Sequence, residues 1–409
     1  MKESDAIPAP KVLQQALRST TETLAAELAS PGSVAPEWSE LQWQTARAVA
    51  AIHGVSALLA SRLRWSGPAE WQCFLRQQRE HTLIRHGRMQ QLLQALDVSL
   101  KQAAIPAVTL KGAELYAIGL YEPGERPMGD LDLLVRGPDV ERATAVLHSL
   151  GFRESYPHWK HQAFVPEVAR TPGPLGEHAD NDIKIELHER VCERLPLDEI
   201  DISQIVFPAR PHVGLNAYPS KAALITHLLL HAAGAMMWRG LRLMHLHDLA
   251  LLCSRMTESD WTHFMSDAAG GPGVWWAMPP LALTAHYYPH AVPKHLLAIV
   301  AADCRWVLRR ASRQYRLSDV SLSRLHIEAF PGIEWAQSLP EAFRYAVKRV
   351  RPDEEARAVY AHIVSYEAWA SNSPWFQLPH YRRALRWVTS RPTRQATMHA
   401  VRAAFRERL

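Results

Sequence analysis

The sequence predicts an α+β protein in which a small mixed β-sheet lies between two helical regions. Three observations support this prediction: apolar residues recur at helical spacing up to about residue 100, short β-prone runs replace that pattern between 105 and 191, and helical spacing returns beyond 220. We therefore expect an N-terminal helical region at 1–99, an α/β core at 100–215 and a C-terminal helical domain with an Arg-rich tail at 216–409.

Length and composition are those of an ordinary folded protein. The chain has 409 residues, 47% of them apolar and 21% charged, so it is too long for one hydrophobic core and too apolar for wholesale disorder. The first residues lead into no apolar signal segment, and no stretch is apolar enough to cross a bilayer. Four widely spaced cysteines favour reduced thiols over a disulfide framework. We expect a cytoplasmic protein without membrane contact.

The elements of the predicted core follow from changes in residue pattern. A β-prone run at 106–110 ends at Lys111 and Gly112, and the apolar spacing after them indicates a short helix. Pro138 and Asp139 open another helix, which Gly151 ends. Three further extended segments are expected, at 131–135, 161–165 and 183–191, and a polar connection rich in Pro and Gly separates the last two.

Two helical regions flank these elements. Segments 31–33 and 66–68, which contain Pro and Gly, divide the N-terminal region into separate helices. Beyond 220 the helices become rich in Trp and Arg, and residues 382–408 hold eight arginines against one acid, Glu407. Such a tail attracts any polyanion, but a solvated helical face is the favoured interpretation.

The chemistry is expected to centre on Asp130 and Asp132. They stand two residues apart in a run of Leu and Val, and strand geometry places both carboxylates on one face. Two like charges held side by side call for a cation, and hard oxygen ligands on a strand suit Mg²⁺. The plainer alternative is a sheet with acidic residues on its wet edge.

A later strand repeats the same pattern. Ile183, Ile185 and Leu187 share one face, which leaves Lys184, Glu186 and His188 on the other. If this strand lies beside the one that carries Asp130, Glu186 completes a three-carboxylate cluster able to hold two metal ions and to accept a proton from a nucleophile. His188 would orient a carboxylate or touch substrate.

Cationic groups are predicted to complete a phosphate-binding site. Lys111 and Gly112 stand at a strand-to-helix turn, where backbone N–H groups favour phosphate and a glycine permits close approach. Arg126 is a candidate for a second phosphate clamp because its planar fork suits bidentate contacts. The alternative for Lys111 and Arg126 is a structural ion pair with nearby acids.

His227 and His231 lie four residues apart on a predicted helix, and His245, His247 and Asp248 follow, which raises the hypothesis of a zinc site. The chain lacks the H-E-x-x-H pattern. A helix face that packs against the α/β core with satisfied histidines is the favoured interpretation.

Taken together, these motifs resemble a poorly characterised bacterial family of nucleotidyltransferases in the DNA polymerase β-like superfamily. The resemblance covers roughly residues 38–261. It is carried by 110–113, 121–123, 126–127, 129–135 and 185–188, by the N-terminal helical stretch 53–59, and by the later segments 227–231, Arg242 and 247–249.

The resemblance implies a polymerase β-like core. Asp130 and Asp132 match the metal-binding pair, Glu186 the third acid, and Gly112 the nucleotide-binding turn. Two departures stand out. Many members of the superfamily have Ser where this chain has Ala113, and many have Asp where it has Glu186.

We therefore predict a nucleotidyltransferase that moves a nucleoside monophosphate from a nucleoside triphosphate, ATP being the expected one, to an acceptor hydroxyl. The expected cofactor is Mg²⁺ or Mn²⁺, and the acceptor is a protein or peptide, a small molecule or RNA. The alternative, which Ala113 favours, is a catalytically weak or inactive nucleotide-binding protein with a regulatory or antitoxin-like role. A metal hydrolase built on His227 and His231 is the third hypothesis.

Overall fold

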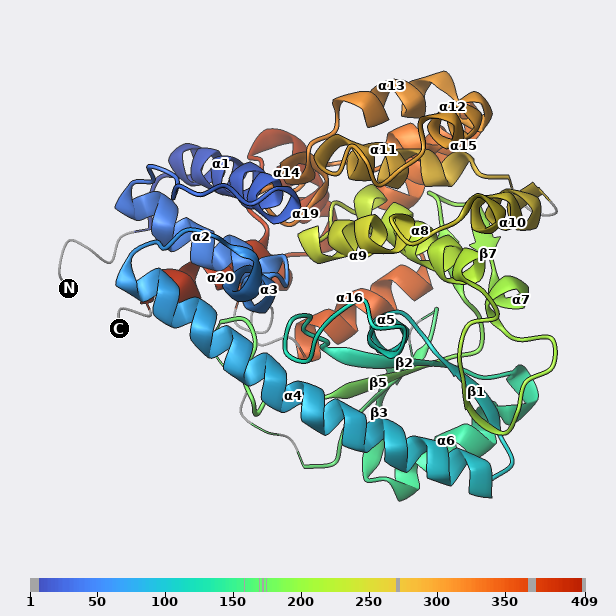
Figure 1. The fold of residues 1–409 in the computed structure, drawn as a ribbon. Helices are drawn as coiled ribbons and strands as arrows, with labels where there is room; N and C mark the ends of the chain where they lie inside the picture. Colours follow the sequence, from blue (N-terminus) through green and yellow to red (C-terminus); the bar gives the residue numbers. More distant parts are fainter. Residues whose placement is uncertain are drawn as a thin grey trace.

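The computed structural model describes residues 7–157, 159–168, 170, 173, 175–269, 273–366 and 373–406. Within them a mixed sheet lies between helices, which confirms the predicted α+β fold (Figure 1). No helix among these residues is both long enough and apolar enough to traverse a bilayer.

Two of the N-terminal helices, α1 and α3, end close to the predicted breaks, whereas the break between α2 and α3 was not expected. Ser39 opens the second helix with a capping box, in which its side chain accepts a hydrogen bond from the backbone N–H of Gln42. The fourth helix runs for 34 residues and packs its apolar residues, among them Met89 and Leu96, against the sheet. The four helices are α1 (Pro10–Ala29), α2 (Glu40–Ile52), α3 (Ser56–Arg62) and α4 (Ala69–Gln102).

The main sheet has six strands in the order β3-β4-β5-β2-β1-β8. β2 pairs in parallel with β5 and antiparallel with β1, so the sheet is mixed, as predicted. Its strands are β1 (Pro106–Thr109), β2 (Asp130–Leu134), β3 (Phe152–Pro157), β4 (Gln162–Pro166), β5 (Lys184–His188) and β8 (Gly214–Asn216). A separate two-stranded sheet joins β6 (Cys192–Arg194) to β7 (Glu199–Asp201).

Short helices connect these strands: α5 (Gly112–Ala117), the 3₁₀ turn η2 (Gly137–Asp139), α6 (Val140–Ser149) and α7 (Ser203–Val206). The strands of the predicted core appear within a few residues of their expected places. β3, β6, β7 and β8 were not expected. β8 pairs in parallel with β1 and ends at Asn216, so the sheet crosses the predicted core boundary at 215.

Helices fill the rest of the chain. The central one, α8, has Ser220 as its N-cap and is buried along most of its length. These helices are α8 (Lys221–Met237), α9 (Leu243–Cys253), α10 (Glu258–Ala269), α11 (Met278–Tyr287), α12 (Lys294–Asp303), α13 (Trp306–Gln314), α14 (Leu317–Val320), α15 (Leu339–Val350), α16 (Glu354–Tyr366), α18 (Pro374–Gln377), α19 (His380–Thr389) and α20 (Gln395–Arg406). Two 3₁₀ turns, η3 (Trp275–Ala277) and η4 (Ile333–Trp335), lie among them.

The buried apolar residues form two clusters that do not follow the predicted regions. One lies under the sheet, where α4 and α6 cover it. The other joins the N-terminal helices to the C-terminal ones, because α1 packs on α14 and α2 packs on α20 (Figure 1). The three-region division thus stays a prediction, and the first and third regions share one core.

The Arg-rich tail is only partly a solvated face. Arg383 is buried, and Arg394 donates hydrogen bonds to the carbonyl oxygens of Trp238 and Arg239. Arg382, Arg386 and Arg402 are exposed. Residues 407–409, which include Glu407 and Arg408, lie outside the described residues.

His53 links the two ends of the larger core. Its Nδ1 accepts a hydrogen bond from the backbone N–H of Leu243 at 2.9 Å, and its Nε2 lies 2.9 Å from the hydroxyl of Ser323. Burial, with a smaller effect from Arg242, lowers the pKa of His53 to about 3, so the ring is neutral.

We expect His53→Ala to lower the free energy of unfolding by about 3 kcal/mol, because it opens a cavity and leaves the buried N–H of Leu243 without its partner, while the Ser323 hydroxyl keeps only Thr21. Urea unfolding followed by circular dichroism measures the change. His148→Ala, on a half-exposed side chain, is the control and should cost less than about 0.5 kcal/mol. Equal effects of the two substitutions would contradict the linking role.

Candidate active site

The predicted site residues come together where β1 ends and β2 begins. Lys111 follows β1, Asp130 opens β2, and the antiparallel pairing of the two strands brings these ends together. In the parallel pairing of β2 with β5, Asp132 lies opposite Glu186. The expectation that the acidic strand lies beside the Asp130 strand is therefore met.

Asp132 is the buried centre of the site. Its side chain is only 6% exposed. Its Oδ1 accepts hydrogen bonds from Lys111 Nζ at 2.8 Å and from His188 Nε2 at 3.0 Å. Burial opposes ionisation of Asp132, but Lys111 and His188 outweigh it and hold its pKa well below the usual value. Asp132 is therefore ionised and paired.

Asp130 has a different environment. It is exposed, and its side chain forms no hydrogen bond or ion pair with any residue the structure describes. The protein around it and the carboxylates of Asp132 and Glu186 raise its pKa to about 6. An accessible carboxylate that is repelled by its neighbours is the group in this site most ready to take a cation.

Glu186 belongs to a cluster with two histidines. Its Oε2 lies 3.3 Å from His161 Nδ1 and 3.6 Å from His188 Nε2. Of the residues described, these are the only three metal-ligating groups whose ligand atoms all lie within 4.8 Å of one another. Asp130 and Asp132 share a face with Glu186, but the three predicted acids do not converge that closely.

Lys111 holds an unusual backbone conformation. Its φ is +49°, a region that costs a non-glycine residue about 1–3 kcal/mol and that recurs at functional sites. Its N–H donates to the Tyr218 hydroxyl at 3.2 Å, and that hydroxyl lies 2.7 Å from His227 Nδ1. Helix α8 thus braces the turn that aims the lysine at Asp132.

Gly112 and Arg126 have protein partners. A Cβ on Gly112 would lie 2.5 Å from Arg126 Nη1 and 2.7 Å from Met128 Sδ, so protein fills the space that the glycine leaves. Arg126 itself donates from Nε and Nη2 to the two carboxylate oxygens of Asp248, at 2.9 and 2.8 Å. For Arg126, this geometry favours the structural ion pair over the predicted phosphate clamp.

The histidines of α8 and α9 are packed residues. Burial above all, with smaller effects of nearby cations, holds the pKa values of His227, His231 and His245 well below the usual value. His227 is bonded to Tyr218, and the rings of His231 and His245 lie 4.8 Å apart. This arrangement supports satisfied core histidines over the zinc hypothesis.

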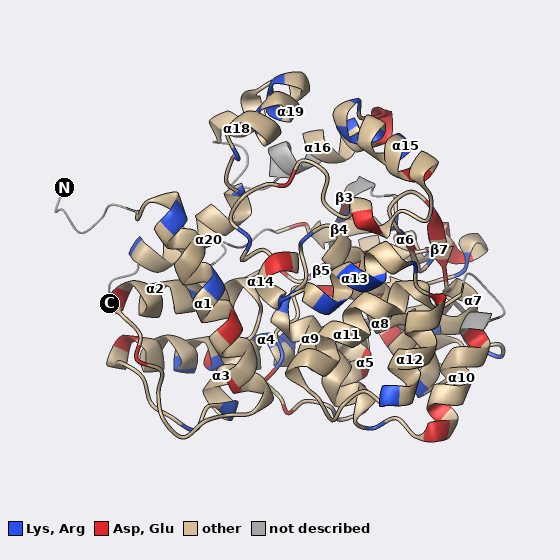
Figure 2. Ribbon diagram, turned by 90° about the horizontal axis from the view of Figure 1, so that it is seen from above, with Lys and Arg blue, Asp and Glu red and all other residues tan. Residues whose placement is uncertain are grey.

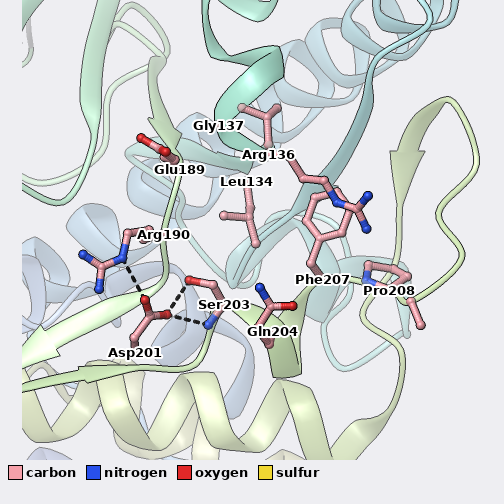
Figure 3. A pocket seen from close by; sticks show the side chains of 12 residues that line it. Leu134, Arg136, Gly137, Glu189, Arg190, Asp201, Ser203, Gln204, Phe207 and Pro208 are labelled. Atoms are coloured by element: carbon pink, nitrogen blue, oxygen red, sulfur yellow. Dashed lines mark hydrogen bonds and ion pairs between the residues drawn. The ribbon is translucent and has the colours of Figure 1, made fainter.

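A cavity of about 620 Å³ lies at the opposite ends of β2 and β5 (Figure 3). Arg136 and Phe207 line it, and Asp201 binds Arg190 and Ser203 beside it. None of the predicted site residues lines this cavity. We therefore do not assign it to the site.

Sequence reasoning missed His161, Tyr218 and the proximity of Arg242. His161 stands at the start of a predicted strand, and its position beside the acidic strand was the one available signal. Arg242 directly precedes α9 and is exposed. Its positive charge acts to lower the pKa of Asp130, but the effects that raise this pKa are stronger. Arg242 forms no ion pair within the described part of the chain.

A model of the family described as "Uncharacterised nucleotidyltransferase" matches residues 39–271, more than half of the chain. The match extends from α2 to the end of α10 and includes every predicted site residue. No curated protein and no solved structure matches the chain. The nucleotidyltransferase part of the resemblance is confirmed, and membership of the polymerase β-like superfamily stays a prediction.

We expect Lys111→Met to lower the free energy of unfolding by about 3 kcal/mol, because it leaves the buried Asp132 carboxylate with too little positive charge. Lys101→Met removes a half-exposed ion pair with Asp97 and should cost less than about 0.5 kcal/mol. Urea unfolding of both variants tests this. A Lys111→Met protein as stable as the Lys101→Met protein would show that the ion pair contributes little.

The buried histidines predict acid sensitivity. Four histidines have pKa values that are lowered in the folded state, so they bind protons more readily in the unfolded chain. They are His53, His227, His231 and His245. The free energy of unfolding should therefore fall as the pH drops below the unfolded value of about 6.5. Groups whose folded pKa is raised, such as Asp130 at about 6 and His188, act in the opposite direction but are fewer than the histidines whose pKa is lowered.

Thermal unfolding from about pH 7.5 to about pH 5 measures this dependence. His245→Gln, which removes one of these protons, should give a shallower decline. A melting temperature that stays constant over this range would contradict the assignment of neutral buried histidines.

Proposed function

Because the chain belongs to the uncharacterised nucleotidyltransferase family, we propose that it transfers a nucleoside monophosphate from a nucleoside triphosphate to an acceptor hydroxyl. The observation that carries this proposal is the meeting of Lys111, Asp130 and Glu186, from three separate segments, around the buried Asp132. We further propose a polymerase β-like core, which the order of strand, turn, helix, acidic strand and later acidic strand supports.

The residues present fit a divalent cation. Asp130, Asp132 and Glu186 offer the oxygen ligands that Mg²⁺ and Mn²⁺ take, and one or two such ions would neutralise the triphosphate and the departing pyrophosphate. His161 and His188 add imidazoles beside Glu186. Imidazole is a poor ligand for Mg²⁺, so we propose that Mn²⁺ supports the reaction at least as well as Mg²⁺.

In the proposed reaction the acceptor oxygen forms a bond to the α-phosphorus, and the bond from that phosphorus to the pyrophosphate oxygen breaks. Glu186 accepts the hydroxyl proton, directly or through water. Lys111 gives up its contact with Asp132 and binds the triphosphate instead, with ATP as the expected donor. Arg242, rather than the paired Arg126, is the second phosphate-binding cation. Catalysis then consists of positioning and charge neutralisation.

Asp130→Asn is the most informative substitution. Asp132 is tied to Lys111 and His188, so its replacement disturbs the fold, whereas exposed Asp130 has no such partner. We expect Asp130→Asn to lower label transfer from α-³²P-labelled nucleoside triphosphates to components of a cell extract by at least about 100-fold. Its melting temperature should be equal or higher, because the raised pKa of Asp130 means that its negative charge does not stabilise the fold. Glu189→Gln, an exposed acid just beyond β5, is the matched control and should retain activity.

The rival hypothesis makes a different prediction for the same assay. A nucleotide-binding regulatory or antitoxin-like protein would bind nucleotide in a metal-dependent way but release no pyrophosphate with any of the four nucleotides. Ala113, which offers no hydroxyl to the phosphates, favours this rival. Metal-dependent binding without transfer, with Mg²⁺ and with Mn²⁺, would replace our proposal by it.

A further inference from the structure

A second cavity, of about 910 Å³, lies between the α/β part and the C-terminal helices. Trp159, Lys160 and Arg194 line it from the strand side, and Arg349 on α15 and Arg383 on α19 line it from the helical side. A cavity of this size suits a small organic molecule. It contacts none of the residues predicted from the sequence to form the site.

The lining of this cavity is rich in positive charge, with six Lys and Arg against two acids. Lys and Arg of α15 and α19 are visible in Figure 2. Both acids are already engaged. Arg194 Nη1 lies 2.8 Å from Glu355 Oε1, and Lys348 Nζ lies 3.4 Å from Asp353 Oδ2. Lys160 pairs with Glu193, which lies outside the lining, and the three remaining arginines have no acid to balance them among the described lining residues.

These three arginines are Arg349, Arg357 and Arg383, and Arg357 is exposed, which leaves Arg349 and Arg383 within the wall. Neither forms an ion pair with any residue that the structure describes. Arg383 is 7% exposed, and its buried Nε has no hydrogen-bond partner. Burial lowers the pKa of both guanidinium groups, and Arg349 contributes to the shift of Arg383. A buried cation next to a second, partly buried cation, with no acid paired to either, is costly unless an anion joins them.

Aromatic rings hold these two guanidinium groups. The guanidinium carbon of Arg349 lies 4.4 Å from the centre of the Trp387 ring, and that of Arg383 lies 3.5 Å from the centre of the Tyr360 ring. Arg349 Nε donates to the carbonyl oxygen of Ala329 at 3.3 Å, so its terminal Nη groups, together with the guanidinium of Arg383, are the donors left for a planar or tetrahedral oxyanion. The same rings offer apolar faces to the rest of a ligand.

The cavity also adjoins the candidate active site. Lys160, which lines the cavity, directly precedes His161, which contacts Glu186. Lys160 Nζ lies 2.5 Å from the buried Glu193 Oε1. The connection between β3 and β4 thus contributes one residue to the wall of the cavity and the next to the Glu186 cluster.

We propose that this cavity binds the acceptor, and that the acceptor is a small molecule with a flat apolar part and a phosphate or carboxylate group held by Arg349 and Arg383. The proposal rests on the nucleotidyl transfer proposed above and names its acceptor class. It assigns the C-terminal helices, which lie beyond the matched family region, the role of substrate recognition.

Isothermal titration of the full-length protein with phenyl phosphate and with benzoate tests the cavity and distinguishes the two oxyanions. Inorganic phosphate and phenol, each of which lacks one half of the predicted ligand, are the weaker-binding comparisons. We expect the Arg349→Gln, Arg383→Gln double variant to weaken binding of the preferred probe by at least about tenfold. The Arg344→Gln, Arg386→Gln control changes exposed arginines of the same two helices and should leave binding unchanged.

The label-transfer assay separates this inference from the proposed function. The Arg349→Gln, Arg383→Gln protein should bind ATP normally but transfer at least about tenfold less label to the small-molecule fraction of a cell extract.

Equal probe binding by the two double variants overturns the anion site. Loss of ATP binding in the cavity variant, or label on RNA or protein that it leaves unchanged, overturns the acceptor role. Probe binding that depends on Arg349 and Arg383, without transfer by the unsubstituted protein, supports the anion site and contradicts only the proposed function.

Discussion

The parallel pairing of β2 with β5 is the constraint on which the site depends. It places Asp132 beside Glu186 on one face of the sheet, and a buried carboxylate next to another acid is stable only with nearby positive charge. Lys111 and His188 supply that charge, and the strained backbone at Lys111 is held in place by Tyr218 from beyond the sheet. Contacts that start from one carboxylate thereby connect the turn after β1 to α8.

Asp130 and Asp132 illustrate how two identical side chains acquire different roles. One is exposed and has a raised pKa, and the other is buried, paired and ionised. The first can exchange ligands at little structural cost, whereas the second anchors the site. In the proposed reaction this difference separates the group that recruits a cation from the group that fixes where the cation sits.

Much of the fold and part of the site could be predicted from sequence because the informative patterns were local. The period-2 alternation around Asp130 and Glu186 indicated both strands, and the turn at Lys111 was visible from its neighbours. Strand β8 was missed because three residues carry no periodicity. The pairing of Arg126 with Asp248 was not predictable, since 122 residues separate the two in the chain and either could have met another partner.

The packing of α2 on α20 has a consequence for biosynthesis. Helix α2 leaves the ribosome long before α20, which covers part of its apolar face. Contacts of such large sequence separation slow folding, because a long loop must close before they form. The larger core is therefore completed only after α20 has emerged, whereas α4 and the sheet can pack much earlier.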